Sequence, residues 1–271
     1  MNITGIIREY CHTQKHDASL YELPDNCTCD QLQEKIRTIN PDRVIATGGD
    51  GTVRLVAECL QGTQIPLGIL PTGSANGMAR ELDIPSDIEA ALGIITTGRL
   101  KRIHLVRVNG ELCIHLCDIG FNAFVVREFE KSRRRGMFGY IIAAWKVLWR
   151  RPSMWADIKT DGQIIRRKAA MIVVANATQY GNGVVINPEG SLEDHCFEVI
   201  VVRQVSFSEI FKMRVTHRPY DPRKTELFHT AKLTIRSRRK VHFQIDGEYK
   251  GKVNKLQAEL LPRALYVISN T

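Results

Sequence analysis

Short apolar runs alternate with helix-spaced apolar residues over the first hundred positions of the chain. The runs predict strands at Ala18–Leu23, Arg43–Thr47 and Pro66–Leu70. Between them, apolar residues recur at helical spacing over Cys29–Ile39 and Val53–Leu60. Strand, loop and helix in series indicate a parallel sheet with helices on its faces.

Two further helices are expected before the pattern changes. A short one ends before Pro85, and Ser86 is the expected N-cap of a second one that runs to about Thr97. After Gly98 the helical spacing gives way to strand-like runs, several of them joined by hairpin signals such as Asn109-Gly110.

The chain after Gly98 is expected to form an antiparallel β-sandwich or barrel. One helix, over about Phe138–Arg150, interrupts its strands. The expected strands are Arg102–Val108, Glu111–Cys117, Trp155–Thr160, Ile164–Ala175, Phe197–Val205, Lys232–Arg236 and Val241–Ile245. We therefore expect an α/β domain over residues 1–98 and a β-rich domain over residues 99–271.

The charge balance of the chain is basic, since 38 Lys and Arg against 29 Asp and Glu give a net charge of +9. A basic surface attracts polyanions, and charge alone does not choose among nucleic acid, an anionic membrane and nucleotide phosphates. A nucleic-acid-binding module is disfavoured, because the sequence contains no recognisable helix-turn-helix, zinc finger or aromatic stacking motif.

Cysteine usage and hydropathy indicate the cellular compartment. Seven cysteines, an odd number without a paired Cys-x-x-Cys motif, favour reduced thiols in a cytoplasmic protein over disulfides or a structural zinc site. The first residues, MNITGIIREY, carry no signal peptide. The longest apolar stretch, Phe138 to Trp149, is too short to span a bilayer, so a lipid could be reached only from the membrane surface.

The segment Gly48–Thr52 (GGDGT) joins an expected strand to an expected helix. Its three glycines let the backbone approach a ligand closely, and the helix start offers N–H groups to phosphate oxygens. The carboxylate of Asp50 would repel a bare phosphate, which suggests that Mg²⁺ lies between them. A turn with an N-cap aspartate is the alternative interpretation.

A second small, polar loop, Leu70–Gly77 (LPTGSANG), repeats this design one strand later. Open α/β sheets bind their ligands at the carboxyl ends of successive strands. Either loop alone is a weak signal. Together, about twenty residues apart, the two loops predict a phosphate-binding site.

The segment Gln244–Glu248 lies at the end of an expected strand. Asp246-Gly247 is a common hairpin turn, which is one interpretation of this motif. Glu248, directly after the turn, is a candidate general base that takes the proton from an attacking hydroxyl group.

These motifs resemble the diacylglycerol kinase catalytic family, which also includes sphingosine and ceramide kinases. The matching segments are ATGGDGTV, LGILPTGSANGMARELDIP, DIGFNA, YGNG…INPEGSLED and IDGE. The loop GGDGT is shared with NAD kinases and phosphofructokinases, and its combination with the late Asp-Gly-Glu is more specific. The resemblance implies an NAD-kinase-like nucleotide-binding domain, a lipid-binding β-sandwich, and transfer of the γ-phosphoryl group of ATP to diacylglycerol or a related long-chain lipid.

The resemblance also implies roles for single residues. Asp50 would help to hold Mg²⁺, and Glu248 would deprotonate the lipid hydroxyl group. The residues expected to contact the nucleotide are Gly48, Gly49, Asp50, Gly51, Thr52, Gly73 and Ser74.

A second, structural Mg²⁺ is found in bacterial relatives, in a loop of the β domain. The resemblance implies that the side chain of Asp194 and the backbone carbonyls of Ser191 and Cys196 would hold it here. Where the family aspartate is normally followed by glycine, this chain has His195.

The chain departs from the family pattern in three further places. The family begins with a strand and an Asn-Pro-x-Ser-Gly loop, whereas this chain starts at what resembles the following helix, so the first strand is expected to be missing. Gly77 stands where many bacterial diacylglycerol kinases have Asp. Asp118 falls where sphingosine kinases place an aspartate that recognises the substrate head group, although a strand-end turn residue is an equal alternative. The last two positions favour a sphingoid-like or other long-chain alcohol.

Basic residues flank the apolar segment FGYIIAAWKVLW. They are Lys131, Arg133, Arg134, Arg135, Arg150 and Arg151. Such a segment can lie in the headgroup layer of a bilayer, and a core helix bounded by solvated charges is the alternative. We hypothesise that it covers the lipid pocket and docks the protein peripherally on an anionic membrane. Replacing Arg133, Arg134 and Arg135 with Ala would then lower liposome binding.

Two alternatives from the same residues stay open. A soluble nucleotide kinase such as NAD kinase shares GGDGT, but its downstream Asn-Glu motif has no convincing match here. A non-catalytic lipid or nucleotide sensor is favoured by the missing first strand and by Gly77, and ATP binding without turnover would support it. The sequence leaves the identity of the lipid and homodimer formation open.

Overall fold

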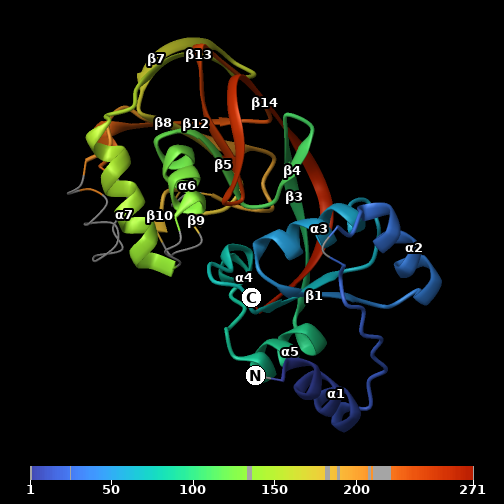
Figure 1. The fold of residues 1–271 in the computed structure, drawn as a ribbon. Coiled ribbons are helices and arrows are strands. Elements are labelled where there is room, and N and C mark those ends of the chain that lie inside the picture. Colours follow the sequence, from blue (N-terminus) through green and yellow to red (C-terminus); the bar gives the residue numbers. More distant parts are fainter. Residues whose placement is uncertain are drawn as a thin grey trace. The chain divides into compact units, whose positions relative to one another are not determined.

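Two compact units make up the computed structural model of the chain (Figure 1). The first comprises Met1–Ile103 together with Arg263–Thr271, and the second comprises His104–Pro262. The residues that the structure describes are 2–24, 26–132, 136–180, 184–187, 190–206, 209 and 221–270.

The first unit is an α/β arrangement, as the sequence predicts. Its elements are α1 (Ile3–Gln14), α2 (Cys29–Ile39), β1 (Val44–Gly48), α3 (Asp50–Leu60), β2 (Leu67–Pro71), α4 (Gly77–Glu81), α5 (Ile88–Thr97) and the first part of β3 (Arg99–Val108). Strands β1 and β2 pair in parallel, and Val267 pairs in the same sense with Leu67. Helices α2 and α3 cover one face of this sheet, and α1 and α5 cover the other (Figure 1).

Polar side chains determine where these helices begin. Thr28 and Gln31 form a capping box at the start of α2, whose predicted range is confirmed. Helix α5 is capped by Asp87, whose Oδ1 accepts the N–H of Ala90 at 2.8 Å. The prediction of Ser86 as this cap was wrong by one residue, because Asp87 is the residue whose side chain reaches the free donor of the first turn.

The predicted strand at Ala18–Leu23 is also wrong, because these residues form a connection without regular secondary structure between α1 and α2. Its apolar side chains Leu20 and Tyr21 are exposed. A strand needs a neighbour that shares its backbone hydrogen bonds, and in the described part of the chain β1 pairs only with β2.

The second unit is β-rich, with two helices after its first strands. It contains the rest of β3, β4 (Glu111–Cys113), β5 (Leu116–Gly120), α6 (Phe121–Lys131), α7 (Gly136–Trp149), β6 (Met154–Lys159), β7 (Ile164–Ala169), β8 (Met171–Ala175), β9 (Gln179–Tyr180), β10 (Val184–Val185), β11 (Phe197–Val202), the 3₁₀ helix η1 (Pro222–Lys224), β12 (Thr225–Thr230), β13 (Lys232–Ile245) and β14 (Glu248–Ser269). The sheet order β14-β13-β5-β8-β11-β12 is antiparallel at every step. The predicted antiparallel β-sandwich is therefore confirmed.

Two hydrophobic cores lie on opposite faces of this sheet. In β8, Ile172 and Val174 point into a core shared with β6, β13 and β14. Their neighbours Met171, Val173 and Ala175 pack against α6 and α7 instead. Successive side chains of a strand point to opposite faces, so a strand buried on both faces reads as the continuous apolar run seen here.

Several strand predictions needed correction at their boundaries. The predicted strands Glu111–Cys117 and Ile164–Ala175 are each two strands, and the second one breaks at Ala170. Conversely, two predicted strands, Lys232–Arg236 and Val241–Ile245, belong to the single strand β13. Its pairing with β14 shifts register between Arg236 and Val241. The polar residues at this shift interrupt the apolar alternation without ending the strand.

Helix α6 and strand β14 were not predicted. Strand β14 alternates buried and exposed residues, but its lysines and Pro262 obscure the apolar signal. It leads the chain back into the first unit at Arg263. The observed division therefore differs from the expected boundary at Gly98, because β3 changes units after Ile103 and the last residues rejoin the first unit.

Candidate functional site

The first set of candidate residues lies at the start of α3. This helix begins at Asp50, directly after β1, and its N-cap Gly49 makes no side-chain capping bond. The N–H groups in the first turn of an α-helix have no partners within the helix, and the helix dipole is positive at this end. The start of α3 therefore offers donors to a negatively charged group such as a phosphate.

Close packing requires glycine where the two loops meet. A Cβ atom on Gly73 would lie 2.5 Å from the Cα atom of Gly49, and one on Gly48 would lie 2.5 Å from Oγ1 of Thr52. Side-chain atoms do not come this close to backbone atoms in folded proteins. Gly73 is thus needed for the two loops to touch, whereas Gly48 is needed for the close approach of Thr52 within its own loop.

Hydrogen bonds hold the second loop against the first. The N–H of Thr72 donates to the carbonyl of Gly48 at 3.1 Å. Asn76, which has a left-handed φ of 49°, forms two hydrogen bonds with the backbone of Gly73. Its Oδ1 accepts the N–H of Gly73 at 3.0 Å, and its Nδ2 donates to the carbonyl of Gly73 at 2.9 Å. Gly73 and Ser74 are exposed to solvent, so the tip of this loop is accessible to a ligand.

Asp50 links the two loops through its carboxylate. Oδ2 accepts the N–H of Gly77 at 3.0 Å, and Oδ1 accepts the N–H of Met78 at 3.2 Å. A carboxylate has about four acceptor positions, so these bonds leave room for the Mg²⁺ contact that the sequence predicts, which stays a prediction. The bonds show a positioning role for Asp50 that sequence reasoning missed.

The second set of candidate residues surrounds the turn between β13 and β14. Asp246 (φ 48°) and Gly247 (φ 85°) form a two-residue hairpin, with Ile245 paired to Glu248. Two positive φ angles in succession define a type I′ turn, which favours Asp-Gly. The hairpin interpretation of this motif is therefore confirmed.

Asp246 does more than form the turn. Its carboxylate accepts the N–H groups of Ile114, His115 and Leu116 at 3.0–3.1 Å, and the thiol of Cys113 lies 3.6 Å from Oδ1. These bonds fix the β13–β14 turn to the connection between β4 and β5. The carboxylate therefore determines where the neighbouring Glu248 is held.

Glu248 is the first residue of β14, and its side chain is 45% exposed. Its Oε2 lies 3.3 Å from Nζ of Lys250, which also pairs with Glu111 at 2.7 Å. A general base must be accessible to the proton that it removes, and this exposure satisfies that condition. The catalytic role of Glu248 stays a prediction.

Asp118 on β5 is fully buried. Its carboxylate accepts hydrogen bonds from Nδ2 of Asn122 at 2.6 Å, from the N–H of Ala123 at 2.8 Å and from Nε2 of Gln244 at 2.6 Å. Gln244 in turn accepts the N–H of Gly247 at 2.7 Å. Asp118 thus connects the start of α6 to the turn that carries Glu248, whereas its predicted contact with a substrate head group stays untested.

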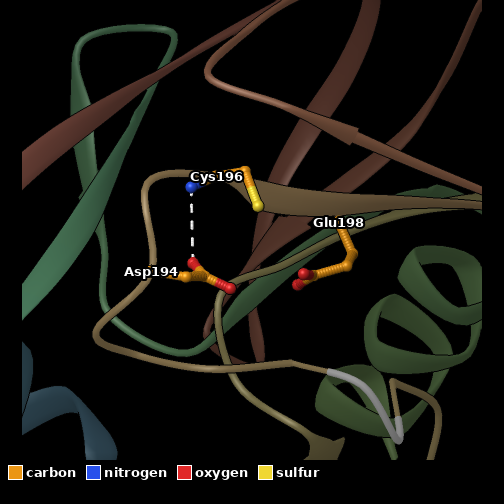
Figure 2. Close-up of side chains that lie close together, drawn as sticks. All are labelled: Asp194, Cys196 and Glu198. Atoms are coloured by element: carbon orange, nitrogen blue, oxygen red, sulfur yellow. Dashed lines mark hydrogen bonds between the residues drawn. The ribbon is translucent and has the colours of Figure 1, made fainter.

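A third set of residues lies before and within β11. Figure 2 shows the carboxylates of Asp194 and Glu198 facing each other, with the sulfur of Cys196 beside them. Burial raises the pKa of the Cys196 thiol to about 11, and the two carboxylates add to the shift. Burial also raises the pKa of Glu198.

The structural metal site was predicted to use Ser191, Asp194 and Cys196. Oδ1 of Asp194 accepts the N–H of Cys196 at 3.3 Å, and Oγ of Ser191 accepts the N–H of Glu193 at 3.2 Å. The predicted contacts of a metal with the carbonyls of Ser191 and Cys196 stay predictions. Sequence reasoning missed Glu198, because a glutamate inside an apolar strand was taken as part of the strand pattern alone.

No helix in the described part of the chain is long and apolar enough to cross a membrane. Helix α7, which contains the apolar segment singled out in the sequence, has 14 residues. The basic residues Arg133, Arg134 and Arg135 lie outside the residues that the structure describes.

An α/β unit with two interlocked glycine loops, joined in sequence to an antiparallel β unit, defines the NAD-kinase-like class of fold. Two family models match the chain and together cover most of it. The diacylglycerol kinase catalytic domain matches residues 2–108, and the YegS C-terminal NAD kinase beta sandwich-like domain matches residues 116–269. The chain belongs to the diacylglycerol kinase catalytic-domain family.

Individual relatives agree with this placement. A diacylglycerol kinase of Staphylococcus saprophyticus is 25% identical over 233 residues, which are 83% of this chain and 76% of that protein. A diacylglycerol kinase of Staphylococcus aureus is 26% identical over 221 residues, 79% of this chain and 70% of its own length.

Solved structures share the fold. A diacylglycerol kinase from Bacillus anthracis superposes with a TM-score of 0.68 at 21% identity, covering 93% of this chain and 84% of that one. An NAD kinase from Archaeoglobus fulgidus in complex with ATP gives a TM-score of 0.58 at 15% identity. The match covers 100% of this chain and 90% of that one. The predicted family and the predicted fold class are therefore confirmed.

Proposed function

We propose that the protein is an ATP-dependent lipid kinase that transfers the γ-phosphoryl group to a hydroxyl group of diacylglycerol or a related long-chain lipid. The observation that carries this proposal is the pair of interlocked glycine loops at the uncapped start of α3. Such an arrangement suits nucleotide phosphates. Family membership, and relatives named diacylglycerol kinase, support lipid as the acceptor.

In the proposed reaction the first unit binds the nucleotide. N–H groups of Gly48–Thr52, Gly73 and Ser74 would contact the phosphates, while Asp50 holds the loops together. Mg²⁺, when bound, would neutralise charge on the phosphates, and Asp50 is the residue that fits it as a ligand. Glu248 would take the proton of the lipid hydroxyl group.

The geometry of Asp118 favours a glyceride over a sphingoid base as the acceptor. A sphingoid head group would need the Asp118 carboxylate, which is fully buried and accepts three hydrogen bonds from the protein. Releasing it would leave those donors without partners, at a cost of about 1–3 kcal/mol each. Gly77, the other position that favoured a sphingoid substrate, uses its backbone N–H to bind Asp50.

The proposal is tested by phosphate transfer from γ-labelled ATP, in the presence of Mg²⁺, to lipids in mixed micelles. The panel contains diacylglycerol, monoacylglycerol, sphingosine, ceramide and a polyprenol, with NAD as a soluble acceptor. We expect label in diacylglycerol above the others. Label in NAD alone would make the protein a nucleotide kinase, and ATP binding without any labelled product would make it a sensor.

We further propose that helix α7 docks the protein on an anionic membrane surface. Ile141, Trp145 and Trp149 are spaced four residues apart and are exposed, with Trp149 74% accessible. Residues four apart share one face of a helix. Lys146 and Arg150 lie beside them and are also exposed. Exposed tryptophans next to basic residues suit insertion between lipid headgroups.

Replacing Trp145 and Trp149 together with Ala is expected to weaken binding to phosphatidylglycerol-containing liposomes by about tenfold or more, because two aromatic side chains lose their burial in the bilayer. Co-sedimentation measures the binding. The matched control is Trp155→Ala, since Trp155 on β6 is also exposed and should not contribute. Equal losses in the control and the double variant would contradict docking through α7.

A further inference from the structure

Four neighbouring strands of the second unit, β7, β6, β13 and β14, present one face to solvent. Their register pairs Arg166 with Asp157, Asp157 with Arg236, and Arg236 with Lys255. Directly paired residues of neighbouring strands point to the same side of a sheet. These side chains are exposed, whereas their neighbours along the strands, such as Ile235, lie in the core. The register therefore assigns the four side chains to a single outward face.

This outward face, the basic face from here on, carries an excess of positive charge. Its cations are Lys159, Arg166, Lys168, Lys232, Arg236 and Lys255. Its carboxylates are already paired, Asp157 with Arg166 at 3.6 Å and Glu259 with Lys232 at 3.5 Å. Four cations, one on each strand, form no ion pair with any residue that the structure describes: Lys168, Lys159, Arg236 and Lys255. Because neighbouring strands lie about 4.8 Å apart, these charges are concentrated on a small area and attract a polyanion.

An exposed tryptophan lies among these cations. Trp155 on β6 pairs with Lys168 on β7 and is 53% exposed. The guanidinium carbon of Arg166 lies 5.7 Å from the centroid of the Trp155 ring. A flat aromatic ring can stack on a nucleobase, and a neighbouring guanidinium group strengthens such stacking through cation–π attraction. The basic face therefore offers a stacking surface as well as positive charge.

A hollow of about 820 Å³ opens at one end of the basic face. Arg107, Lys159 and Lys232 contribute cationic groups to its lining. The carboxylate of Asp161, which also lines the hollow, accepts the N–H groups of Ala231 and Lys232 at 2.8 and 3.1 Å. Guanidinium and ammonium groups suit phosphate oxygens, and the volume lies within the range of small-molecule sites. The hollow thus extends the attraction for phosphate beyond the flat part of the face.

The basic face and helix α7 lie on opposite sides of the second unit. Helices α6 and α7 pack against one side of β5, β8 and β11. Strands β6, β13 and β14 pack against the other side of these three strands, with the basic face outward. A membrane docked on α7 would therefore not reach the basic face. A second copy of the chain does not suit it either, because two basic faces repel each other.

We propose that the basic face binds single-stranded nucleic acid. The four unpaired cations contact successive phosphates, and one base stacks on Trp155. Cations on a sheet beside an exposed aromatic ring suit a single strand, because every nucleobase has a face that stacks. The cations come from four separate strands, so the linear sequence contains no motif that would indicate this binding.

The test titrates the full chain into a fluorescein-labelled single-stranded RNA of about twelve nucleotides and follows the fluorescence anisotropy at several salt concentrations. The affinity should fall as salt rises, with a slope of about −3 in a plot of log K against log salt, because four phosphate contacts release counterions. Excess ATP should leave the RNA bound, since the glycine loops are not part of the basic face. Neither readout depends on phosphoryl transfer.

Matched variants separate charge from stacking. Replacing Arg236 and Lys255 together with Ala should weaken RNA binding and make the salt slope shallower by about 1.4, because two phosphate contacts are lost. Trp155→Ala should weaken binding by about fivefold or more and leave the slope unchanged, because stacking releases no counterions.

Each variant has a control. Replacing Arg8 and Arg37 together with Ala removes the same charge from exposed positions on α1 and α2 of the first unit. Trp149→Ala removes a more exposed tryptophan from α7. Both controls should bind the RNA like wild type, and thermal denaturation checks that every variant is folded.

Several outcomes would overturn the proposal. An equal change of slope in the Arg8 and Arg37 control would show diffuse attraction to the whole chain, and unchanged affinity in Trp155→Ala would remove the stacked base. Displacement of the RNA by ATP would place it at the glycine loops. Polyglutamate that displaces the RNA at an equal concentration of negative charge would indicate an acidic protein instead. A loss of anionic liposome binding in the Arg236 and Lys255 variant would assign the face to a membrane.

Discussion

Replacing Glu248 with Gln is expected to lower kcat for lipid phosphorylation by about 10²–10⁴-fold, which is the usual contribution of a general base. The affinity for ATP should change little, because a general base acts on the acceptor hydroxyl group and not on the groups proposed to bind the phosphates. The melting temperature should also stay the same, since the side chain is 45% exposed and glutamine keeps its shape. Steady-state kinetics with labelled ATP, together with thermal denaturation, measure these quantities.

The control for this experiment is Glu111→Gln. Glu111 pairs with Lys250, the same lysine that contacts Glu248, and it is similarly exposed. The control variant removes a negative charge from Lys250 without touching the proposed base, so its kcat should stay within about twofold of wild type, as expected for a surface ion pair. Equal losses of kcat in both variants would contradict the role of Glu248 as a base and assign the effect to Lys250.

The phosphate loops could be predicted from the sequence because their signal is local. In Gly48–Thr52, the glycines, the preceding apolar strand and the following helical spacing all lie within about twenty residues. The structure confirms this strand–loop–helix succession as β1 and α3. The Asp246-Gly247 turn was recognised for the same reason, since a two-residue hairpin is encoded by the residues that form it.

Long-range partners could not be predicted in the same way. Asp246 binds backbone N–H groups about 130 positions earlier in the chain, and Asp118 binds Gln244 across a separation of 126 residues. A sequence does not indicate which backbone N–H groups bind a side chain, because every residue except proline has such a donor. Asp118 could therefore be interpreted only as a substrate contact or a strand-end turn residue, whereas the structure shows it supporting the turn that carries Glu248.

The metal site at Ser191, Asp194 and Cys196 was predicted through the family resemblance, but the sequence did not indicate that Glu198 lies beside Asp194 and Cys196. Cys196 and Glu198 are two residues apart and therefore share one face of an extended chain, a spacing that many strands show without a ligand. His104, ninety positions earlier on β3, is likewise brought close to Asp194 only by the fold. From the sequence, a histidine within an apolar strand is interpreted as a core residue. Only the structure shows that the ring nitrogens of His104 form no hydrogen bond.

Replacing Gly73 with Ala is expected to weaken ATP binding by about tenfold or more and to lower the free energy of unfolding by roughly 1–3 kcal/mol. The added Cβ would lie 2.5 Å from Cα of Gly49 and 2.8 Å from Oδ1 of Asn76. Backbone atoms cannot rotate away as a side chain can, so the two loops must separate. Their separation would misalign the N–H donors at the start of α3, which are the groups proposed to bind the phosphates.

Gly93→Ala is the matched control, because Gly93 lies in helix α5 of the same unit and an added Cβ would meet nothing within 4 Å. Alanine favours the helix, so this variant should gain about 0.5–1 kcal/mol of stability and bind ATP like wild type. Calorimetric titration with ATP, beside denaturant unfolding of both variants, separates the two effects. If Gly73→Ala lost stability but bound ATP with unchanged affinity, the contact between the loops would serve the fold alone, and the phosphate site would have to lie elsewhere.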